Sequence, residues 1–300
     1  MTQAPKQNAK NKALLLGAFL IALFVLFALL VLSEYEDVDV TAPPPVAKES
    51  LNVLFIDVGQ GDSILLTFDS GQTMLIDAGP KSGSDAITRQ LDLLGITKID
   101  YLVATHPHAD HIGGMQRIIE NYEIGLIYMP DYKSASKTYS DFMKAAESRH
   151  ISVTLAYAGL EFSFGPAACT IVSPPKEAEW DANNSSAVIF LDFGDTDFLF
   201  TGDMEALAER FVLEAGYTVD AEVLKAAHHG SKSSTSEAFL IGVSPEYVVI
   251  SCGADNRYGH PHDDTLELLD RYGITSLRTD LLGNILFIAD GQELVLTYGH

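Results

Sequence analysis

Three of the nine histidines in this 300-residue chain lie within six residues, in the sequence THPHADHIGG at residues 105–114. The apolar residues 99–104 come directly before them, so a strand would deliver these side chains to the edge of a sheet. Gly113 and Gly114 then allow a tight turn before an apolar-periodic, helical segment at residues 115–119. Imidazole combined with carboxylate suits zinc, manganese or iron, because borderline nitrogen donors are joined by hard oxygen donors. The segment therefore predicts a metal site with the ligands His106, His108, Asp110 and His111.

Ligand-type residues follow apolar runs at four other places in the chain. They are Asp77 after residues 74–76, Asp203 after residues 198–202, the pair His228 and His229 after residues 223–227, and His260 with His262 in residues 256–262. Each one alone is weak evidence, because an aspartate after a strand more often forms a turn, and a single histidine is more often a surface or core residue. Together with residues 105–114 they indicate several ligands that converge at the ends of strands.

The order of these motifs resembles that of the metallo-β-lactamase-fold hydrolases, and the resemblance covers essentially all of residues 51–300. Four motifs look most like the hydrolase domain of the bacterial DNA-uptake competence channel, ComEC. They are DVGQGDS at residues 57–63, NNSS at residues 183–186, HHGS at residues 228–231 and YGHP at residues 258–261. The resemblance implies a metal-dependent hydrolase, in the first place a phosphodiesterase or nuclease, whose cofactor is one or two divalent ions, zinc or manganese.

The resemblance also implies two metal positions that share the carboxylate of Asp203. The first position takes His106, His108 and Asp203, and the second takes Asp110, His111, Asp203 and either His228 or His229. Many members of the superfamily supply a further histidine before the shared aspartate, but the only histidine in residues 112–202 is His150, at a helix-to-strand junction. The corresponding stretch holds Asn183 and Asn184, which are expected near the metals as weak ligands or as partners of the ligands. The first position would then be weakly occupied, filled by a harder ion such as manganese, or empty.

The other candidate site residues follow from the same resemblance. A divalent metal lowers the pKa of a bound water towards neutrality, and Asp110 would orient the resulting hydroxide. His260 would contact the substrate or protonate the leaving group, unless it is an ordinary turn residue before Pro261. Asp77 would hold the histidine loop in place from behind the ligands. The residues expected to contact the substrate are Gln60, Asp62 and Ser231.

Short apolar runs and glycine-containing turns alternate with helical segments from residue 51 onwards. Strands are predicted at residues 53–58, 63–68, 73–77, 99–104, 125–129, 151–156, 186–193, 196–200, 222–225, 247–250, 276–278, 284–288 and 293–297, with a hairpin at 160–172. Helices are predicted at residues 84–94, 115–119, 136–149, 205–215, 236–241 and 265–272. Two sheet-forming halves, each with its own helices, predict an α/β fold of four layers, αββα, with the sheets face to face and the helices outside.

The first fifty residues differ in composition from the rest. Residues 13–32 are uncharged and apolar, and at about 1.5 Å per residue they are long enough to cross a hydrocarbon core about 30 Å thick. Lysines in residues 1–12 precede this run and acidic residues follow it, so we expect a cytoplasmic N-terminus and a membrane-anchored catalytic domain outside the cytoplasm. A cleaved signal peptide and a secreted domain are the alternative, although the run exceeds the usual length of about 7–15 apolar residues. Residues 33–50 would form an acidic, proline-rich linker to the hydrolase domain at residues 51–300.

The formal net charge is −22, and residues 51–300 carry −21 of it, because residues 1–50 hold four basic and five acidic residues. Such a domain repels polyanions at long range, and no basic nucleic-acid-binding tract offsets the repulsion. The resemblance implies a phosphodiester substrate such as DNA outside the membrane, whereas the acidic charge favours a cell-envelope phosphodiester as the alternative. A lactam or a lactone would use the same metal chemistry but is less supported by the four motifs.

A non-enzymatic alternative is an anchored binding module with a structural metal, but no cysteine lies among the candidate ligands, which argues against a closed structural site. The only cysteines, Cys169 and Cys252, both end or interrupt apolar runs. They predict either one disulfide bridge or two separately buried thiols.

Overall fold

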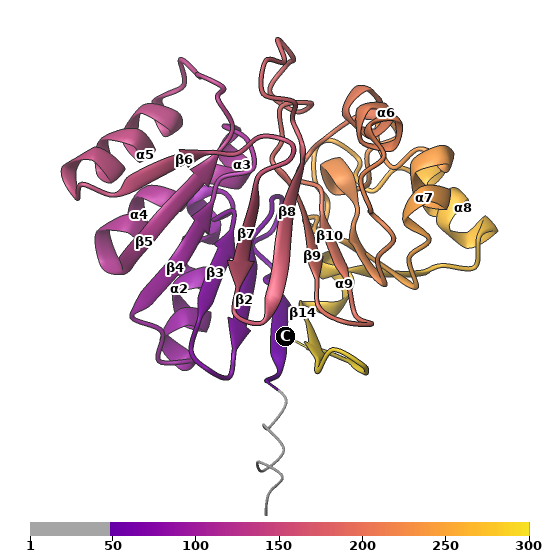
Figure 1. The fold of residues 1–300 in the computed structure, drawn as a ribbon, viewed down its shortest axis with the longest axis horizontal. Helices are drawn as coiled ribbons and strands as arrows, with labels where there is room; N and C mark the ends of the chain where they lie inside the picture. The colour runs from indigo at the N-terminus through magenta and orange to yellow at the C-terminus, as the bar shows by residue number, and fades with distance from the viewer. Residues whose placement is uncertain (1–48, 300) are drawn as a thin grey trace, which may run out of the picture. The chain divides into compact units, whose positions relative to one another are not determined.

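Two β-sheets face each other in the computed structural model, which describes residues 49–299 (Figure 1). The eight-stranded sheet has the order β15-β14-β1-β2-β3-β4-β5-β6. Its strands are β1 (Leu51–Phe55), β2 (Ile64–Phe68), β3 (Thr73–Ile76), β4 (Lys98–Val103), β5 (Glu123–Met129), β6 (Ser152–Leu155), β14 (Asn284–Ala289) and β15 (Leu294–Gly299). Strands β3 to β6 run parallel, and the other neighbouring pairs of this sheet are antiparallel.

The seven-stranded sheet has the order β13-β12-β11-β10-β9-β8-β7. Its strands are β7 (Glu161–Phe164), β8 (Ala167–Ser173), β9 (Val188–Asp192), β10 (Phe198–Phe200), β11 (Val223–Lys225), β12 (Tyr247–Ile250) and β13 (Thr275–Arg278). Strands β10 to β13 run parallel, and strands β7 to β10 are joined by antiparallel pairing. Each sheet thus combines an antiparallel half with a parallel half.

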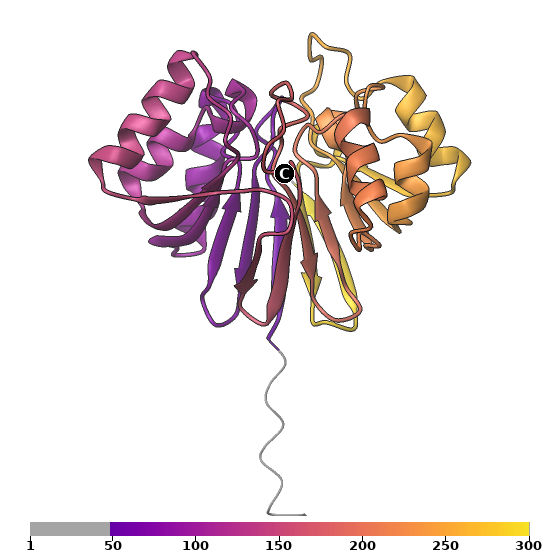
Figure 2. The ribbon, with the colours of Figure 1, turned by 45° about the horizontal axis from the view of Figure 1, so that its top comes forward.

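Helices cover the outer face of each sheet, so the unit has the four layers that the sequence predicts (Figure 1, Figure 2). The eight-stranded sheet is covered by α2 (Ser84–Leu93), α4 (Met115–Asn121) and α5 (Lys137–Ser148), and the seven-stranded sheet by α6 (Ala206–Ala215), α7 (Glu237–Val243) and α8 (Asp263–Arg271). Between the sheets lies an apolar core rich in phenylalanine. The ring of Phe55 in β1, for example, lies 6.3 Å from that of Phe200 in the opposite sheet.

The predicted elements are recovered with small shifts at their ends. The strand predicted at residues 247–250 is β12, the helix predicted at 205–215 is α6 without its first residue, and the hairpin at 160–172 is the pair β7 and β8. Four short elements have no counterpart in the prediction, because three or four residues show no measurable period. They are α3 (Ala109–Ile112), α9 (Thr279–Leu282) and the 3-10 turns η1 (Lys81–Gly83) and η2 (Ala227–Gly230).

The membrane helix expected at residues 13–32 and most of the linker lie outside the described residues. Among residues 49–299, no helix has the length and apolar character needed to cross a membrane. Cys169 and Cys252 are both buried and free, so the expectation of two separate thiols is confirmed over that of a bridge.

The loops after the parallel strands carry the predicted ligands. Asp77 follows β3, His106 follows β4, Asp203 follows β10 and His229 follows β11. In sheets with parallel strands, ligands usually bind outside the carboxyl ends of the strands. The two sheets therefore bring side chains from distant parts of the chain to one end of the sandwich.

Candidate metal centre

Two glycines allow the histidine loop to pack tightly on the loop after β3. A Cβ atom at Gly113 would lie 2.3 Å from the carbonyl oxygen of Ala109, and one at Gly114 would lie 2.3 Å from that of Ala78. The backbone N–H of Ala78 donates to the carbonyl oxygen of His111 at 2.7 Å. Only glycine fits this close backbone contact, which fixes His111 relative to the strand end.

Asp77 holds His111 from behind. The Nδ1 of His111 donates to Oδ2 of Asp77 at 2.7 Å, and Asp77 also accepts from the backbone N–H of Thr105 at 2.8 Å and from its hydroxyl at 2.6 Å. With Nδ1 used in this way, Nε2 of His111 is left with a free lone pair, the usual arrangement of a metal-binding histidine. Burial opposes protonation of His111, but the carboxylates of Asp203 and Asp77 outweigh it and raise the pKa of the imidazole well above its ordinary value. The same carboxylates would favour a metal cation at Nε2, so metal binding there would displace a proton.

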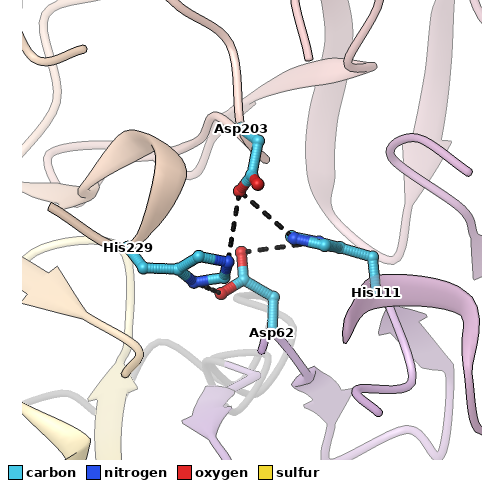
Figure 3. Close-up of side chains that lie close together, drawn as sticks. All are labelled: Asp62, His111, Asp203 and His229. Carbon is cyan, nitrogen blue, oxygen red and sulfur yellow. Dashed lines mark ion pairs between the residues drawn. The ribbon is translucent and has the colours of Figure 1, made fainter. Parts of the chain in front are cut away.

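Four buried side chains converge on one point from four separate segments of the chain (Figure 3). They are Asp62, His111, Asp203 and His229, and one ligand atom of each lies within 4.8 Å of the others. Oδ1 of Asp203 lies 3.2 Å from Nε2 of His111 and 3.6 Å from Nε2 of His229. We call these four residues the buried ligand group.

The atoms that face one another in the buried ligand group lack hydrogen-bond partners. Nε2 of His111, Nε2 of His229, Oδ1 of Asp203 and Oδ1 of Asp62 are all buried and unpaired. Leaving one such atom unsatisfied costs about 1–3 kcal/mol, and more for a charged group. A divalent cation would satisfy all four at once, and two imidazoles with two carboxylates are a donor set that zinc, manganese or iron accepts. The residues therefore fit a metal ion.

His229 and Asp62 are each fixed by a second contact. Nδ1 of His229 donates to the carbonyl oxygen of Ser251 at 2.9 Å, which again leaves Nε2 free. Asp62 pairs through Oδ2 with the ammonium of Lys225 at 2.8 Å, and this lysine is fully buried. Burial raises the pKa of Asp62, but Lys225 and His229 outweigh it and lower the value to about 2. Burial lowers the pKa of His229, but Asp203 and Asp62 outweigh it and raise the value to about 9.

A second group lies on the other side of Asp203 and consists of His106, His108 and Asp203 itself. Nε2 of His106 lies 2.9 Å from Nδ1 of His108 and 3.6 Å from Oδ2 of Asp203. Burial, together with the nearby His111, lowers the pKa of His106 well below its ordinary value, so its imidazole is neutral and able to bind a metal. The two oxygens of Asp203 are thus divided between the two groups, as expected of a carboxylate that bridges two metals.

His228 and His229 point to different oxygens of Asp203. Both residues have left-handed backbone angles, with φ of 51° and 56°, so consecutive side chains reach the same carboxylate. Nε2 of His228 lies 3.8 Å from Oδ2 of Asp203, and its Nδ1 donates to Oε1 of Glu205 at 3.0 Å. His229 therefore belongs to the buried ligand group, whereas His228, which is partly exposed, lies beside the second group and can add a nitrogen to it.

The two residues expected to take part in catalysis lie at the opening of the site. Oδ2 of Asp110 lies 3.5 Å from Nε2 of His229, and the interactions with His229 and His111 outweigh burial and lower the pKa of Asp110. His260 faces His228 and His229 with ring-centroid distances of 5.4 and 6.1 Å. Burial and these two imidazoles lower the pKa of His260 to about 4, so it is neutral near pH 7 and better suited to contacting substrate than to donating a proton.

The structure places three expected residues differently from the prediction. Asp110, expected as a metal ligand, belongs to neither ligand group and lies at the opening of the site. Asp62, expected to contact the substrate, is buried among the candidate metal ligands. Asn184, a possible ligand, instead accepts through Oδ1 from the backbone N–H groups of Glu205 and Ala208 and so caps the start of α6. Its oxygen is used there because the first N–H groups of a helix have no partner inside the helix.

The other expected residues lie near the site without joining the ligand groups. Asn183 contacts the Glu205 carboxylate at 3.5 Å and so lies behind His228. The hydroxyl of Ser231 is buried and bonded to that of Ser233 at 2.9 Å. Gln60 lines a cavity above the ligand groups, and Asn183 and Ser231 do not.

Three functional contacts were missed by the sequence reasoning. The acceptor for His229 is a backbone oxygen of Ser251, which leaves no signal in side-chain patterns. Glu205, which holds His228, lies two residues after Asp203 and was assigned only to a helix. Lys225 had a visible signal, because a lysine inside the apolar run at residues 223–227 must either break a strand or be paired.

A cavity of about 320 Å³ lies over both groups. It is lined by Gln60, His108, Ala109, Asp110, Asp203, His228, His229, Tyr258 and His260. The candidate metal centre is therefore open to a substrate on one side, as a catalytic rather than a structural site requires.

Comparison with known proteins agrees with this geometry. Residues 56–254 match the family model described as the metallo-beta-lactamase superfamily. The chain belongs to the metallo-β-lactamase superfamily. Its fold is the hydrolase fold of that superfamily, and the buried histidine and aspartate groups imply divalent metal ions.

The relatives include competence proteins, as the sequence motifs predict. The chain is 30% identical to ComE operon protein 3 of Bacillus subtilis over 80% of its own length, and 31% identical to competence protein ComA of Neisseria gonorrhoeae over 82%. It spans about a third of the length of these relatives, 33% in both cases. The metallo-β-lactamase fold protein YhfI of Bacillus subtilis has the same fold, with a TM-score of 0.50 at 12% identity over 76% of this chain and 95% of that one.

Proposed function

We propose that this protein is a metal-dependent phosphodiesterase of the competence-protein type, with a nucleic-acid strand as its substrate. The observation that carries the proposal is the division of the Asp203 carboxylate between two groups of imidazoles beneath an open cavity. If both groups hold a divalent ion, the ions would supply the charge that stabilises the attacking and the leaving oxygen of a displacement at phosphorus. The competence relatives support the proposal, since they match 80% and 82% of the chain at 30% and 31% identity.

The chain's own residues have distinct roles in this proposal. Asp62, His111 and His229 would hold one ion and His106, His108 and His228 the other, and Asp203 would contribute one carboxylate oxygen to each group. The bound ions supply hydroxide near neutral pH and neutralise charge on the phosphate. Asp110 stands ionised at the cavity wall, where it would accept a hydrogen bond from the attacking water and so orient it. The neutral imidazole of His260 contacts the phosphate or leaving group from the opposite wall.

The test is hydrolysis of bis-p-nitrophenyl phosphate by purified protein. We expect activity that is lost on chelation and restored by manganese or zinc, and that is at least ten times the rate measured with a chromogenic lactam. Asp110→Asn should lower kcat more than it raises KM. The substitution removes the carboxylate that orients the attacking water by a hydrogen bond, and it leaves the buried ligand group intact. Metal-dependent lactam cleavage without any phosphodiesterase activity would overturn the proposal.

We also propose that residues 13–32 anchor the protein in a membrane and that the hydrolase unit works outside the cytoplasm. The support is the sequence alone, with lysines before the apolar run and acidic residues after it. A protease added to spheroplasts should release the domain into the medium. Protection until the cells are lysed would contradict this orientation.

A further inference from the structure

A second cavity adjoins the one above the metal groups. It has a volume of about 480 Å³ and shares Gln60, Ala109, Asp110 and Tyr258 with the first cavity. A volume of about 300–1,000 Å³ is typical of sites that enclose a small ligand. The two cavities therefore form one continuous depression that leads away from the candidate reaction site.

Two cations line this second cavity from separate loops. Lys81 belongs to the turn η1 after β3, and Arg257 belongs to the loop after β12 in the other sheet. Among residues 49–299, neither side chain has a carboxylate within 4.0 Å. The two acidic residues in the wall are already engaged, since Asp141 pairs with Lys137 and Asp110 faces His229. The wall therefore holds two cations outside any close ion pair, on a domain whose net charge is −21, although Lys81 still acts at longer range on Asp141 and Arg257 on Asp110.

The loop that carries Arg257 is held in one conformation by the side chain of Asn256. Its Oδ1 accepts from the backbone N–H groups of Tyr258 and His260 at 3.2 and 3.0 Å, and its Nδ2 donates to the carbonyl oxygen of Gly253 at 2.9 Å. These bonds use both ends of the amide to hold a loop of eight residues, 253–260, against the metal-centre cavity.

Tyr258 in turn fixes the guanidinium. Nη2 of Arg257 donates to the hydroxyl of Tyr258 at 2.6 Å, and its Cζ lies 4.8 Å from the centre of the ring. The ring itself is stacked on that of His260, with centroids 5.7 Å apart. A guanidinium has five N–H donors in a fixed fork, so one bond to Tyr258 leaves the others for an anion. The contacts with Tyr258 favour one orientation of this exposed guanidinium, which lowers the entropy lost when an anion binds.

We propose that the second cavity binds a further phosphate of the substrate, next to the phosphodiester that is cleaved, through Arg257 and Lys81. The inference rests on the proposed phosphodiesterase function and names the part of the substrate that the enzyme selects. Arg257 binds two phosphate oxygens through its fork, and Lys81 supplies a point charge from the other wall. An acidic domain can in this way hold a short stretch of a polyanion at one place while the rest of its surface repels the strand.

The test uses substrates that differ by one phosphate. The p-nitrophenyl ester of thymidine 5′-phosphate is compared with the same ester carrying a 3′-phosphate, and the p-nitrophenyl ester of thymidine 3′-phosphate with its 5′-phosphorylated form. For wild-type protein we expect one of the two pairs to show at least a tenfold higher kcat/KM with the extra phosphate, mainly through a lower KM. The double variant Arg257→Gln/Lys81→Gln should lose this preference.

The matched control is Arg89→Gln/Arg210→Gln, which changes the net charge equally at two exposed sites outside the cavity. It should keep the wild-type preference, which separates a local subsite from a general effect of charge. Equal cleavage of both members of each pair by wild-type protein would overturn the subsite alone, and so would a preference that survives in the double variant. Cleavage of none of the four esters would overturn the phosphodiesterase function itself, and the subsite with it.

Discussion

Lys225→Met is expected to destabilise the protein strongly, because it breaks a buried ion pair from one side only. The ammonium of Lys225 lies 2.8 Å from Oδ2 of Asp62, both side chains are almost fully buried, and the lysine also donates to the carbonyl oxygen of Ala226 at 2.7 Å. Methionine fills a similar volume without charge. Asp62 would then remain ionised and buried with its main cationic partner gone.

Removing one partner of such a pair typically costs about 3–5 kcal/mol. With a urea dependence of about 3 kcal/mol/M for a domain of this size, the midpoint should fall by about 1–1.7 M. The measurement is urea unfolding with a chelator present, so that metal binding does not contribute. Lys133→Met is the matched control, because this lysine is exposed and its loss should change stability by less than about 0.5 kcal/mol.

The double variant Asp62→Asn/Lys225→Met isolates the interaction. With the carboxylate neutralised, loss of the ammonium no longer leaves an unpaired charge, so the double variant should be more stable than Lys225→Met alone. A loss below about 1 kcal/mol in Lys225→Met, or a double variant less stable than the single one, would refute the view that Lys225 holds Asp62 as an ionised pair. Oδ1 of Asp62 would then not be a fixed metal ligand.

Three further predictions concern the metals and the substrate. Asp203→Asn should lower activity at least 100-fold, and elemental analysis should show loss of metal from both groups while the circular dichroism spectrum stays like that of the wild type. Unchanged metal content would instead show that Asp203 only forms a turn. His228→Ala should weaken only the second of two equivalents of Mn²⁺ in calorimetry, by about 10–100-fold, since it lies beside the second group; two unchanged equivalents would remove His228 from the site. Raising the salt concentration from about 50 to 200 mM should lower the rate of oligonucleotide cleavage less than tenfold, whereas a basic protein with many phosphate contacts would lose about 10³ or more in affinity. A steep fall in the rate would contradict the argument from the net charge of −21.

The four layers could be predicted from the sequence because each strand and long helix carries its own period. Residues 247–250 and 205–215 are examples, since apolar runs and amphipathic segments report burial directly. Short helical turns such as α3 escaped prediction, because their backbone is set by contacts with other loops. The same holds for the left-handed angles of His228 and His229, which neither residue type favours by itself.

Site residues could be predicted where a ligand-type residue directly follows a predicted strand. Contacts between two motifs that are distant in the sequence could not be predicted. His106, His111 and Asp203 follow strands and were expected to meet, and they do lie together. Asp62 lies in a loop between β1 and β2, and only its three-dimensional contact with Lys225 reveals that it faces the ligands. The sequence likewise does not show whether an asparagine binds a metal or caps a helix. Asn184 caps α6 because unpaired N–H groups at the start of that helix lie within reach of its side-chain oxygen.

The four motifs that mark this chain form one connected structure rather than four independent features. The loop of residues 57–63 supplies Asp62, which contacts His229 of the motif at residues 228–231. The stretch 183–186 caps α6 through Asn184, and the N-cap residue of that helix is Glu205, which holds His228. The loop before residues 258–261 is organised by Asn256 and lays His260 against both histidines. Each motif thus positions a neighbour's ligand as well as contributing its own, so a substitution in any of them should disturb metal binding even where the residue touches no metal.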